Sequence, residues 1–216
     1  MKTQLMPLAS AAALILGAGA AMAETSATAM TDLNLRAGPG PMYKIMDVIP
    51  ADGQVEVNGC IESADWCEVV LDGQTGWSYA PYLRSEEDES TLTQAAENDS
   101  VAVVEFSDES DGAALVAGSM GAVIGALVAG PAGAVAGGIL SSATADAVVQ
   151  PEVKIYAAEN PVEPVLLNGE VVVGAVVPED VTVYEMPEHA EYAYLNVNGV
   201  TVILDSKTRQ IVEIVR

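Results

Sequence analysis

The sequence is poor in the side chains that most enzymes use for catalysis. Its 216 residues include only one His and two Cys, and the His lies in a different part of the chain from both Cys. The motifs G-x-S-x-G, G-x-x-x-x-G-K-[ST] and H-E-x-x-H are absent from the sequence. Such motifs mark nucleophiles, phosphate-binding loops and catalytic zinc sites. We therefore expect a protein that is not an enzyme and has no cofactor; a glycosidase that uses carboxylates alone is the remaining enzymatic alternative.

Basic residues are scarce as well. Eight Lys and Arg stand against 31 Asp and Glu, which gives a formal net charge of −23. Binding to DNA, RNA or anionic lipid headgroups depends on clustered Lys and Arg, so we expect no nucleic-acid partner. The acidic composition instead predicts a well-solvated surface that repels copies of itself in low salt.

The first 23 residues have the pattern of a secretory signal peptide. Lys2 precedes an apolar core that includes Ala11–Gly17, and Ala21-Met22-Ala23 forms an A-x-A cleavage site. The alternative is a membrane anchor, but the apolar stretch is short for a span. The pattern predicts an exported protein of the periplasm or cell envelope, whose mature chain begins at Glu24.

Residues 32–84 have the pattern of a small β-barrel. Leu33–Arg36 alternates apolar and polar side chains, as expected for a strand with one buried face. Turn signals follow at short intervals, and Asp72-Gly73 is a strong hairpin signal. We expect about five short strands in this region.

Both Cys residues lie in this barrel region. Two strands joined by the polar turn Glu62–Asp65 would place Cys60 and Cys67 opposite each other. Two thiols in an exported chain usually pair, so we predict a Cys60–Cys67 disulfide. The alternatives are two free thiols or a redox pair, although the C-x-x-C spacing typical of redox sites is absent.

The barrel region resembles the bacterial SH3-like (SH3b) domain family. The resemblance rests on the opening Leu33–Pro39, the strand Asp65–Val69 and the closing Gly76–Leu83. It implies binding of cell-wall peptides or an adaptor role, without catalysis. Candidates for a ligand groove are Arg36, Tyr43, Trp77, Tyr79 and Tyr82. The alternatives are that the aromatic residues form the barrel core and that Arg36 donates hydrogen bonds to carbonyls of its own loop.

The two segments that follow have very different compositions. Residues 85–111 are strongly acidic and predict a disordered linker, within which Val101–Phe106 is either a short strand or an adhesive patch. Residues 112–145 contain no charge, and their small residues recur every fourth position. This spacing resembles glycine-zipper segments and predicts a helical hairpin or kinked span that binds membrane or further copies of the chain. Its proposed contact residues are Gly118, Gly121, Gly125, Gly130, Gly133 and Gly137. A flexible spacer is the alternative.

Residues 153–216 form a third region with a β-hairpin pattern. Asn168-Gly169 and Asn198-Gly199 each lie between runs rich in β-branched residues. The region resembles the DUF1236 type of domain of unknown function, found in exported alphaproteobacterial proteins. The residues that carry this resemblance are Gly174, Pro178, Glu179, Tyr184, Pro187, His189, Tyr192, Tyr194, Val197, Asn198, Thr208, Arg209, Ile211 and Val212. His189 lies near several Glu residues and is either a weak metal ligand or an ordinary side chain that is exposed or hydrogen-bonded.

The predicted fold class is mainly β: a small SH3-like barrel, an acidic linker, a Gly/Ala-rich helical segment and a C-terminal β-hairpin-rich module. The leading functional hypothesis is an exported cell-envelope adaptor. Its barrel would contact peptidoglycan or an envelope protein, and its glycine-rich segment would mediate membrane association or formation of a homo-oligomer. A self-assembling structural or stress-related envelope protein without a ligand is the second hypothesis. A periplasmic metal-handling module at His189 is the third.

Overall fold

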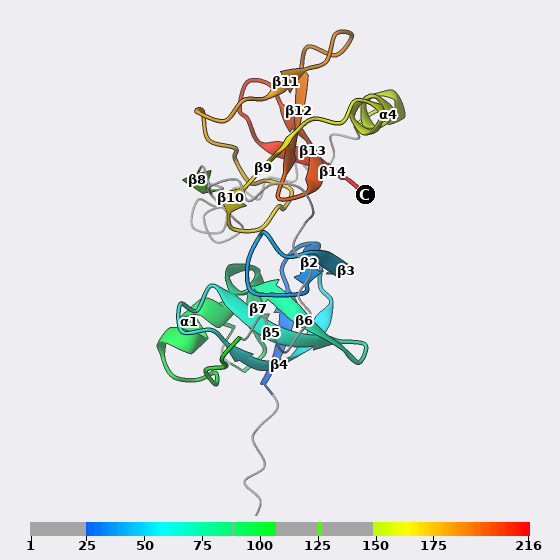
Figure 1. Cartoon of the computed structure of the whole chain (residues 1–216). Coiled ribbons are helices and arrows are strands. Elements are labelled where there is room, and N and C mark those ends of the chain that lie inside the picture. The colour runs from blue at the N-terminus through cyan, green and yellow to red at the C-terminus, as the bar shows by residue number, and fades with distance from the viewer. Residues whose placement is uncertain (1–24, 88, 107–124, 127–148) are drawn as a thin grey trace, which may run out of the picture.

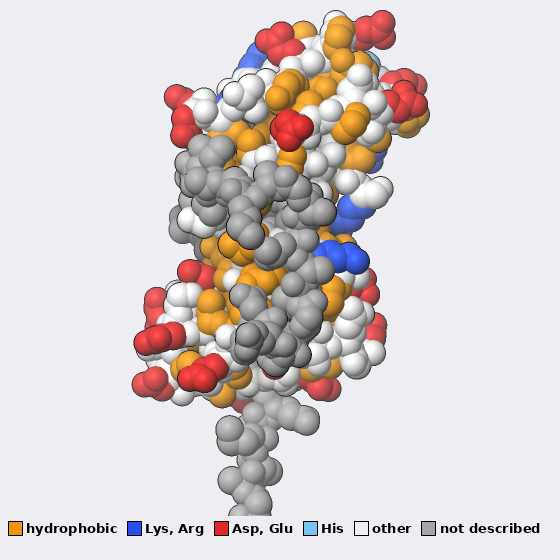
Figure 2. Space-filling model, in the orientation of Figure 1, with side chains coloured by type: hydrophobic (Ala, Val, Ile, Leu, Met, Phe, Trp, Pro, Cys, Tyr) orange, Lys and Arg blue, Asp and Glu red, His pale blue; other side chains and the backbone are white. Residues whose placement is uncertain are grey.

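A computed structural model describes residues 25–87, 89–106, 125–126 and 149–216 of the chain. The described residues form a barrel-like N-terminal sheet and a separate C-terminal sheet, so the prediction of a mainly β protein is confirmed (Figure 1). Acidic side chains are spread over both parts on the face shown in Figure 2. The predicted signal peptide, residues 1–23, lies outside the described residues.

The N-terminal sheet contains seven strands in the order β3-β2-β6-β5-β4-β1-β7. Their bounds are β1 Thr25–Ala29, β2 Leu33–Arg36, β3 Ile45–Ile49, β4 Gln54–Cys60, β5 Trp66–Leu71, β6 Gln74–Tyr79 and β7 Leu83–Ser85. A short 3₁₀ helix, η1 (Ala80–Tyr82), separates β6 from β7. The sequence predicted about five strands. The two additional strands are β1, which begins before the region that has the barrel pattern, and β7, which lies at the end of that region. β1 lies between β4 and β7 and pairs with both of them.

The predicted turn and disulfide of the barrel are both present. β5 and β6 form a hairpin in which Asp72 and Gly73 have positive φ angles of 50° and 83°, as a two-residue turn of this kind requires. Cys60 and Cys67 are directly opposed in β4 and β5 and form a disulfide. This bond ties together the two ends of the loop between these strands.

The prediction of a disordered linker over residues 85–111 differs from the structure at residues 89–106. Helix α1 (Leu92–Glu97) lies there and is capped by Thr91, whose side chain accepts from the backbone N–H of Gln94 while the Gln94 side chain accepts from the backbone N–H of Thr91. Leu92 and Ala95 are buried, and α1 contacts η1 and β7 of the barrel. The helix was not predicted because the region as a whole is strongly acidic. Its two buried apolar side chains lie on one face and are enough to hold it against the barrel.

The C-terminal part is a five-stranded sheet with one helix. The order of its strands is β11-β12-β13-β14, and β9 also pairs with β12. The five strands are β9 Pro164–Val165, β11 Tyr184–Glu185, β12 Tyr192–Val197, β13 Val200–Asp205 and β14 Ile211–Val215, and the helix is α4 Pro151–Glu159. A further short strand, β10 (Leu167–Asn168), lies outside this sheet. Helix α4, which the sequence pattern did not predict, contacts β13 and β14.

Only one of the two predicted Asn-Gly hairpins forms. β12 and β13 pair around Asn198 and Gly199, both of which have positive φ. The predicted hairpin at Asn168-Gly169 is wrong. Instead β10 pairs in parallel with β8 (Gly125–Ala126), and residues 170–175, which would form the second strand of the hairpin, form no strand. The chain turns at Gly169, but tertiary contacts determine where it goes next.

Most of the glycine-rich segment, including Gly118, Gly121, Gly130, Gly133 and Gly137, lies outside the described residues. Gly125 and Ala126 are described and form the short strand β8, not the helix that was predicted there. Among the described residues, no helix has the length and apolar character needed to cross a membrane.

The two parts share one buried apolar cluster. It includes Leu33 and Leu35 of β2 together with Leu167, Val171 and Val172 of the C-terminal part, all of them fully buried. A second cluster forms where α4 covers the C-terminal sheet. Burial of apolar side chains across the junction holds the barrel and the C-terminal sheet together.

Candidate functional site

Arg36 lies at the centre of a buried polar cluster at this junction. It ends β2 next to Trp77 of β6, and its side chain is 0% exposed. Its Nε and Nη2 atoms donate to the two carboxylate oxygens of Glu170, with an Nη2–Oε1 distance of 2.7 Å. Its Nη1 atom donates to the carbonyls of Pro41 and Tyr43 at 3.1 and 2.8 Å. Arg36 is therefore the structural donor of the alternative interpretation and is not exposed in a groove.

Glu170 is the acidic partner that the sequence pattern did not single out. Its side chain is also 0% exposed. Besides the Arg36 bonds, its Oε1 atom accepts from Asn34 Nδ2 at 3.0 Å and from the backbone N–H of Val171 at 2.8 Å. Both carboxylate oxygens are thus paired, as a buried charge requires. Glu170 is one of 31 acidic residues and lies 134 positions from Arg36, so no local pattern identifies it.

The C-terminal hairpin places Glu170 at this position. The side chain of Asn198, in the β12–β13 turn, accepts from the backbone N–H of Leu167 at 2.8 Å. It also donates to the carbonyls of Leu167 and Gly169 at 3.0 and 3.2 Å. Gly169 has a φ of 92°, which directs the following residue toward the barrel. Asn198, one of the residues that carry the DUF1236 resemblance, therefore positions Glu170.

Two further candidates, Tyr43 and Trp77, are buried and contact the only Phe of the chain. The ring of Phe106 lies 5.4 Å from the Tyr43 ring and 5.5 Å from the Trp77 ring, edge to face in both cases. We call Tyr43 and Trp77 the aromatic surface. This surface is covered by the chain itself.

Phe106 belongs to the extended segment Val101–Phe106, which pairs with the barrel. The N–H of Cys60 donates to the carbonyl of Ala102 at 2.8 Å, and the N–H of Val104 donates to the carbonyl of Cys60 at 2.9 Å. The pairing is parallel. It continues along β4 beyond the last β1 pair, Thr25 with Val57. The sequence allowed either a short strand or an adhesive patch here. The structure is closer to the short strand, because the segment pairs with Cys60 through its backbone.

Gly59 allows this close approach. A Cβ atom at Gly59 would lie 2.6 Å from the carbonyl oxygen of Ala102 and 2.6 Å from a methyl carbon of Val104. Real Cβ atoms essentially never show so short a contact. The segment from Val101 to Phe106 therefore needs glycine at this position of β4.

Tyr79 and Tyr82 lie on the side of the barrel near Glu170. Their rings are 5.6 Å apart, and Tyr79 also packs 5.3 Å from Trp66. Burial is the main cause that raises the pKa of both phenols, and the charge of Glu170 raises them further. Tyr82 is buried, as are Arg36, Tyr43 and Trp77. Tyr79 is therefore the only one of the five groove candidates whose side chain is partly exposed.

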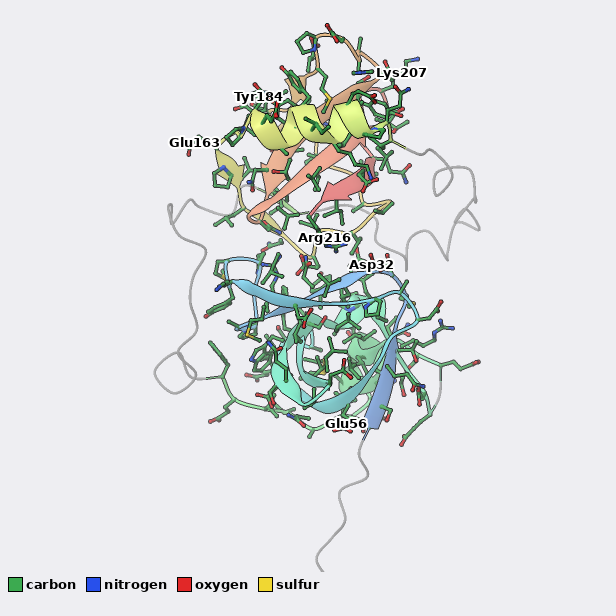
Figure 3. The ribbon with its side chains drawn as sticks, turned by 90° about the vertical axis from the view of Figure 1, so that its right-hand side faces the viewer. Asp32, Glu56, Glu163, Tyr184, Lys207 and Arg216 are labelled. Carbon is green, nitrogen blue, oxygen red and sulfur yellow. A yellow bond between two sulfur atoms is a disulfide. The ribbon has the colours of Figure 1, made fainter. Side chains whose placement is uncertain are left out.

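A second ion pair joins the two parts at their surface. Arg216 donates to Asp32 at 3.3 Å, and Figure 3 shows both side chains between the barrel and the C-terminal sheet. Both are partly exposed, so this pair adds little to stability. The buried pair is the specific connection.

Two further residues that carry the DUF1236 resemblance, Arg209 and His189, do not form a binding site within the residues that the structure describes. Arg209 donates to the carbonyls of Val177, Pro178 and Val181 and so holds one loop of the C-terminal part. His189 Nδ1 lies 3.6 Å from Glu191. In the described part of the chain there is no group of three potential metal ligands.

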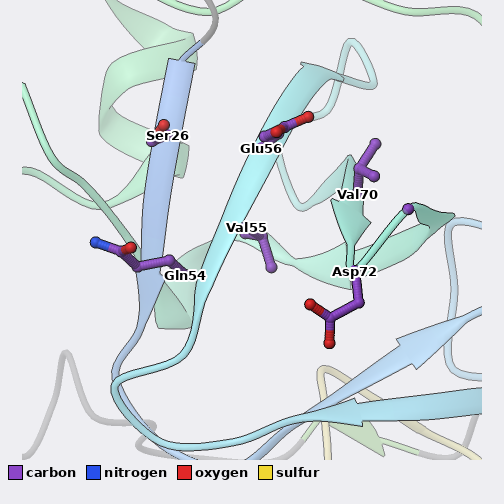
Figure 4. Close-up of a pocket in the computed structure, with 7 residues that line it drawn as sticks. Ser26, Gln54, Val55, Glu56, Val70 and Asp72 are labelled. Carbon is purple, nitrogen blue, oxygen red and sulfur yellow. The ribbon is translucent and has the colours of Figure 1, made fainter.

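A shallow pocket of about 390 Å³ opens on the barrel (Figure 4). It is lined by Ser26, Gln54, Val55, Glu56, Val70, Asp72 and Gly73. None of the five groove candidates contributes to it, and two carboxylates in an open hollow do not form a specific site.

Comparisons with protein families agree with these two parts. Residues 31–84 match the family described as bacterial SH3 domain, and residues 156–216 match the domain of unknown function DUF1236. No curated protein and no solved structure matches the chain. Neither matched family is an enzyme family, and a bacterial SH3 domain suggests a binding function. The chain therefore contains a bacterial SH3 domain followed by a DUF1236 domain.

Proposed function

We propose that this chain is an exported, non-catalytic binding protein of the bacterial cell envelope, and that its SH3 domain binds polypeptide along the aromatic surface. The observation that carries this proposal is the extended segment Val101–Phe106, which already lies there. It is bonded through its backbone to Cys60 and inserts Phe106 against Tyr43 and Trp77. Backbone pairing with a sheet plus an aromatic anchor is a common way for domains to bind extended peptides.

The partner we propose is a peptide of the cell wall or an extended segment of an envelope protein. The signal-peptide pattern of residues 1–23 supports a location outside the cytoplasm. The scarcity of Lys and Arg argues against nucleic acid. Because the intramolecular segment covers the aromatic surface, an external peptide has to displace it.

Retention on purified peptidoglycan sacculi tests the proposal. Phe106→Ala removes the anchor of the intramolecular segment, so we expect more of this variant than of the wild type to be retained. Val103→Ala is the matched control, because Val103 belongs to the same segment but is 69% exposed. Its retention should equal that of the wild type.

Tyr43 and Trp77 are less suitable targets because both are buried and their loss would disturb the barrel. If neither the wild type nor Phe106→Ala is retained on sacculi, the cell-wall peptide is excluded. Crosslinking in intact cells then tests for an envelope protein as the partner. Failure of both experiments would overturn the proposed function.

A further inference from the structure

The cluster around Arg36 has the arrangement of a receptor for a carboxylate. Two guanidinium nitrogens of Arg36 face the two carboxylate oxygens of Glu170, which is the bidentate geometry that Arg offers to carboxylates. The side-chain amide of Asn34 donates a third bond from the same strand, β2. All three side-chain donors come from the SH3 domain, whereas the acceptor comes from the DUF1236 domain.

The receptor side is held in place by the SH3 domain itself. Nη1 of Arg36 donates to the carbonyls of Pro41 and Tyr43, both in the loop that follows β2. These bonds fix the guanidinium plane and do not involve Glu170. A binding group that is oriented before its ligand arrives loses less entropy on binding.

Charge also restricts what can occupy this position. The guanidinium of Arg36 is completely buried, and its neighbour at this position is a carboxylate. If a neutral side chain replaces Glu170 while the two domains stay docked, a buried cation loses its partner at a large cost in free energy. A second carboxylate replaces Glu170 best, because it restores both bonds and the charge balance.

We propose that Arg36 and Asn34 form a carboxylate-binding subsite of the SH3 domain, and that Glu170 occupies it as an intramolecular ligand. The external ligand of this subsite is a peptide that carries a carboxylate. The biological role of this subsite rests on the proposed function, because the subsite specifies the chemistry of the peptide that the SH3 domain is proposed to bind. Docking of the DUF1236 domain and binding of such a ligand at this subsite exclude each other.

Acetate rescue of the full-length Glu170→Ala variant tests the subsite directly. This substitution removes a CH₂ and a carboxylate, which together have nearly the size and charge of acetate. We expect sodium acetate to raise the melting temperature of Glu170→Ala, by about 3 to 6 °C at ten times its Kd. Sodium chloride at equal ionic strength should not produce this shift.

The control is the double variant Arg36→Met/Glu170→Ala, which keeps the space left by the Glu170 side chain but lacks the guanidinium. Acetate and chloride should affect its melting temperature equally. Equal effects of the two salts on Glu170→Ala itself would overturn the inference. If Glu170→Ala does not fold, its refolding yield is compared in the two salts. A higher yield in acetate supports the subsite, and equal yields, including none in either salt, contradict it.

The sacculus assay separates this inference from the proposed function. Acetate rescue without any retention on sacculi or crosslinked partner leaves the subsite in place and overturns the proposed function. Retention of the wild type on sacculi without acetate rescue overturns the subsite and leaves the proposed function in place. Where both hold, Glu170→Gln, which weakens the intramolecular ligand, should raise retention on sacculi; unchanged retention overturns the ligand role of the subsite.

Discussion

Among single residues, Arg36 and Glu170 should have the largest effect on stability. Replacing either residue leaves the other one buried without its charged partner. We expect Arg36→Met and Glu170→Gln each to lower the free energy of unfolding by about 3–5 kcal/mol. The double variant should lose clearly less than the sum, because the second substitution removes the group that the first left unpaired. Urea unfolding of the four proteins measures this coupling.

The exposed pair of Lys154 and Glu213 is the matched control. Its atoms are 2.9 Å apart, but the two side chains are 41% and 28% exposed. Lys154→Met should therefore cost at most about 1 kcal/mol. Additive losses at Arg36 and Glu170 would contradict the view that the buried pair acts as a unit.

Tyr82 should make stability depend on pH in the alkaline range. Burial raises the pKa of its phenol above the ordinary value of 10.0, with smaller contributions from Tyr79 and Glu170. The unfolded chain therefore loses this proton at a lower pH than the folded chain. The stabilisation is complete below about pH 10 and is lost as the pH rises above it.

Tyr82→Phe should flatten this dependence, since Phe has no proton to lose. The measurement is the free energy of unfolding of both proteins between about pH 9 and pH 11. Equal slopes for the wild type and Tyr82→Phe in this range would show that the phenol is not the group responsible.

At the scale of elements, the segment Val101–Phe106 depends on a single glycine of β4. Gly59→Ala places a Cβ atom 2.6 Å from the Ala102 oxygen, so the segment has to move away. We expect a loss of about 1–3 kcal/mol in the free energy of unfolding. We also expect faster hydrogen exchange at the N–H groups of Cys60 and Val104, which bond across this contact.

Val103→Ala is again the control, because Val103 is mostly exposed and its loss should leave exchange at both amides unchanged. Unchanged exchange in Gly59→Ala would mean that the barrel itself shifts while the segment stays in place. The aromatic surface would then remain covered in this variant.

Elements defined by local chemistry were predictable from the sequence. The β5–β6 hairpin follows from Asp72-Gly73 and the β12–β13 hairpin from Asn198-Gly199, because the turn residues alone provide the positive φ angles. Helix α1 had a readable signal in Thr91 and Gln94, which form its capping box. The average acidity of residues 85–111 hid this signal.

Other elements were beyond prediction because their partners are distant in sequence. Asn168-Gly169 has the same turn chemistry as Asn198-Gly199, yet β10 pairs with β8 and Glu170 enters the SH3 domain. Likewise, β1 has a place in the sheet only because β4 and β7 lie on either side of it.

At the scale of the whole molecule, the glycine-rich segment is predicted to determine how the chain associates. Deleting residues 112–145 should abolish oligomers and sedimentation with membranes, because the small side chains of this segment allow neighbouring chains to approach closely. Analytical ultracentrifugation and membrane fractionation measure the two effects. A Gly/Ser segment of equal length, inserted in its place, separates a loss of packing from a change in spacing.

The deletion also removes β8, so the melting temperature of the variant has to be compared with that of the wild type. Association that survives both the deletion and the Gly/Ser replacement would show that the segment is only a spacer. Fractionation of whole cells into periplasm, membranes and sacculus would test the proposed location at the same time.

The two families, the mainly β fold, the disulfide and the scarcity of catalytic side chains were all predictable from the amino-acid sequence. These depend on residue types, short spacings and turn chemistry, which act locally. The contacts of the candidate site residues, in contrast, follow from the folded molecule and not from the sequence pattern. Arg36 meets Glu170 across 134 residues, and Tyr43 and Trp77 meet Phe106. Burial selects such partners by packing and by the need to pair a charge away from water, and neither leaves a local pattern in the sequence.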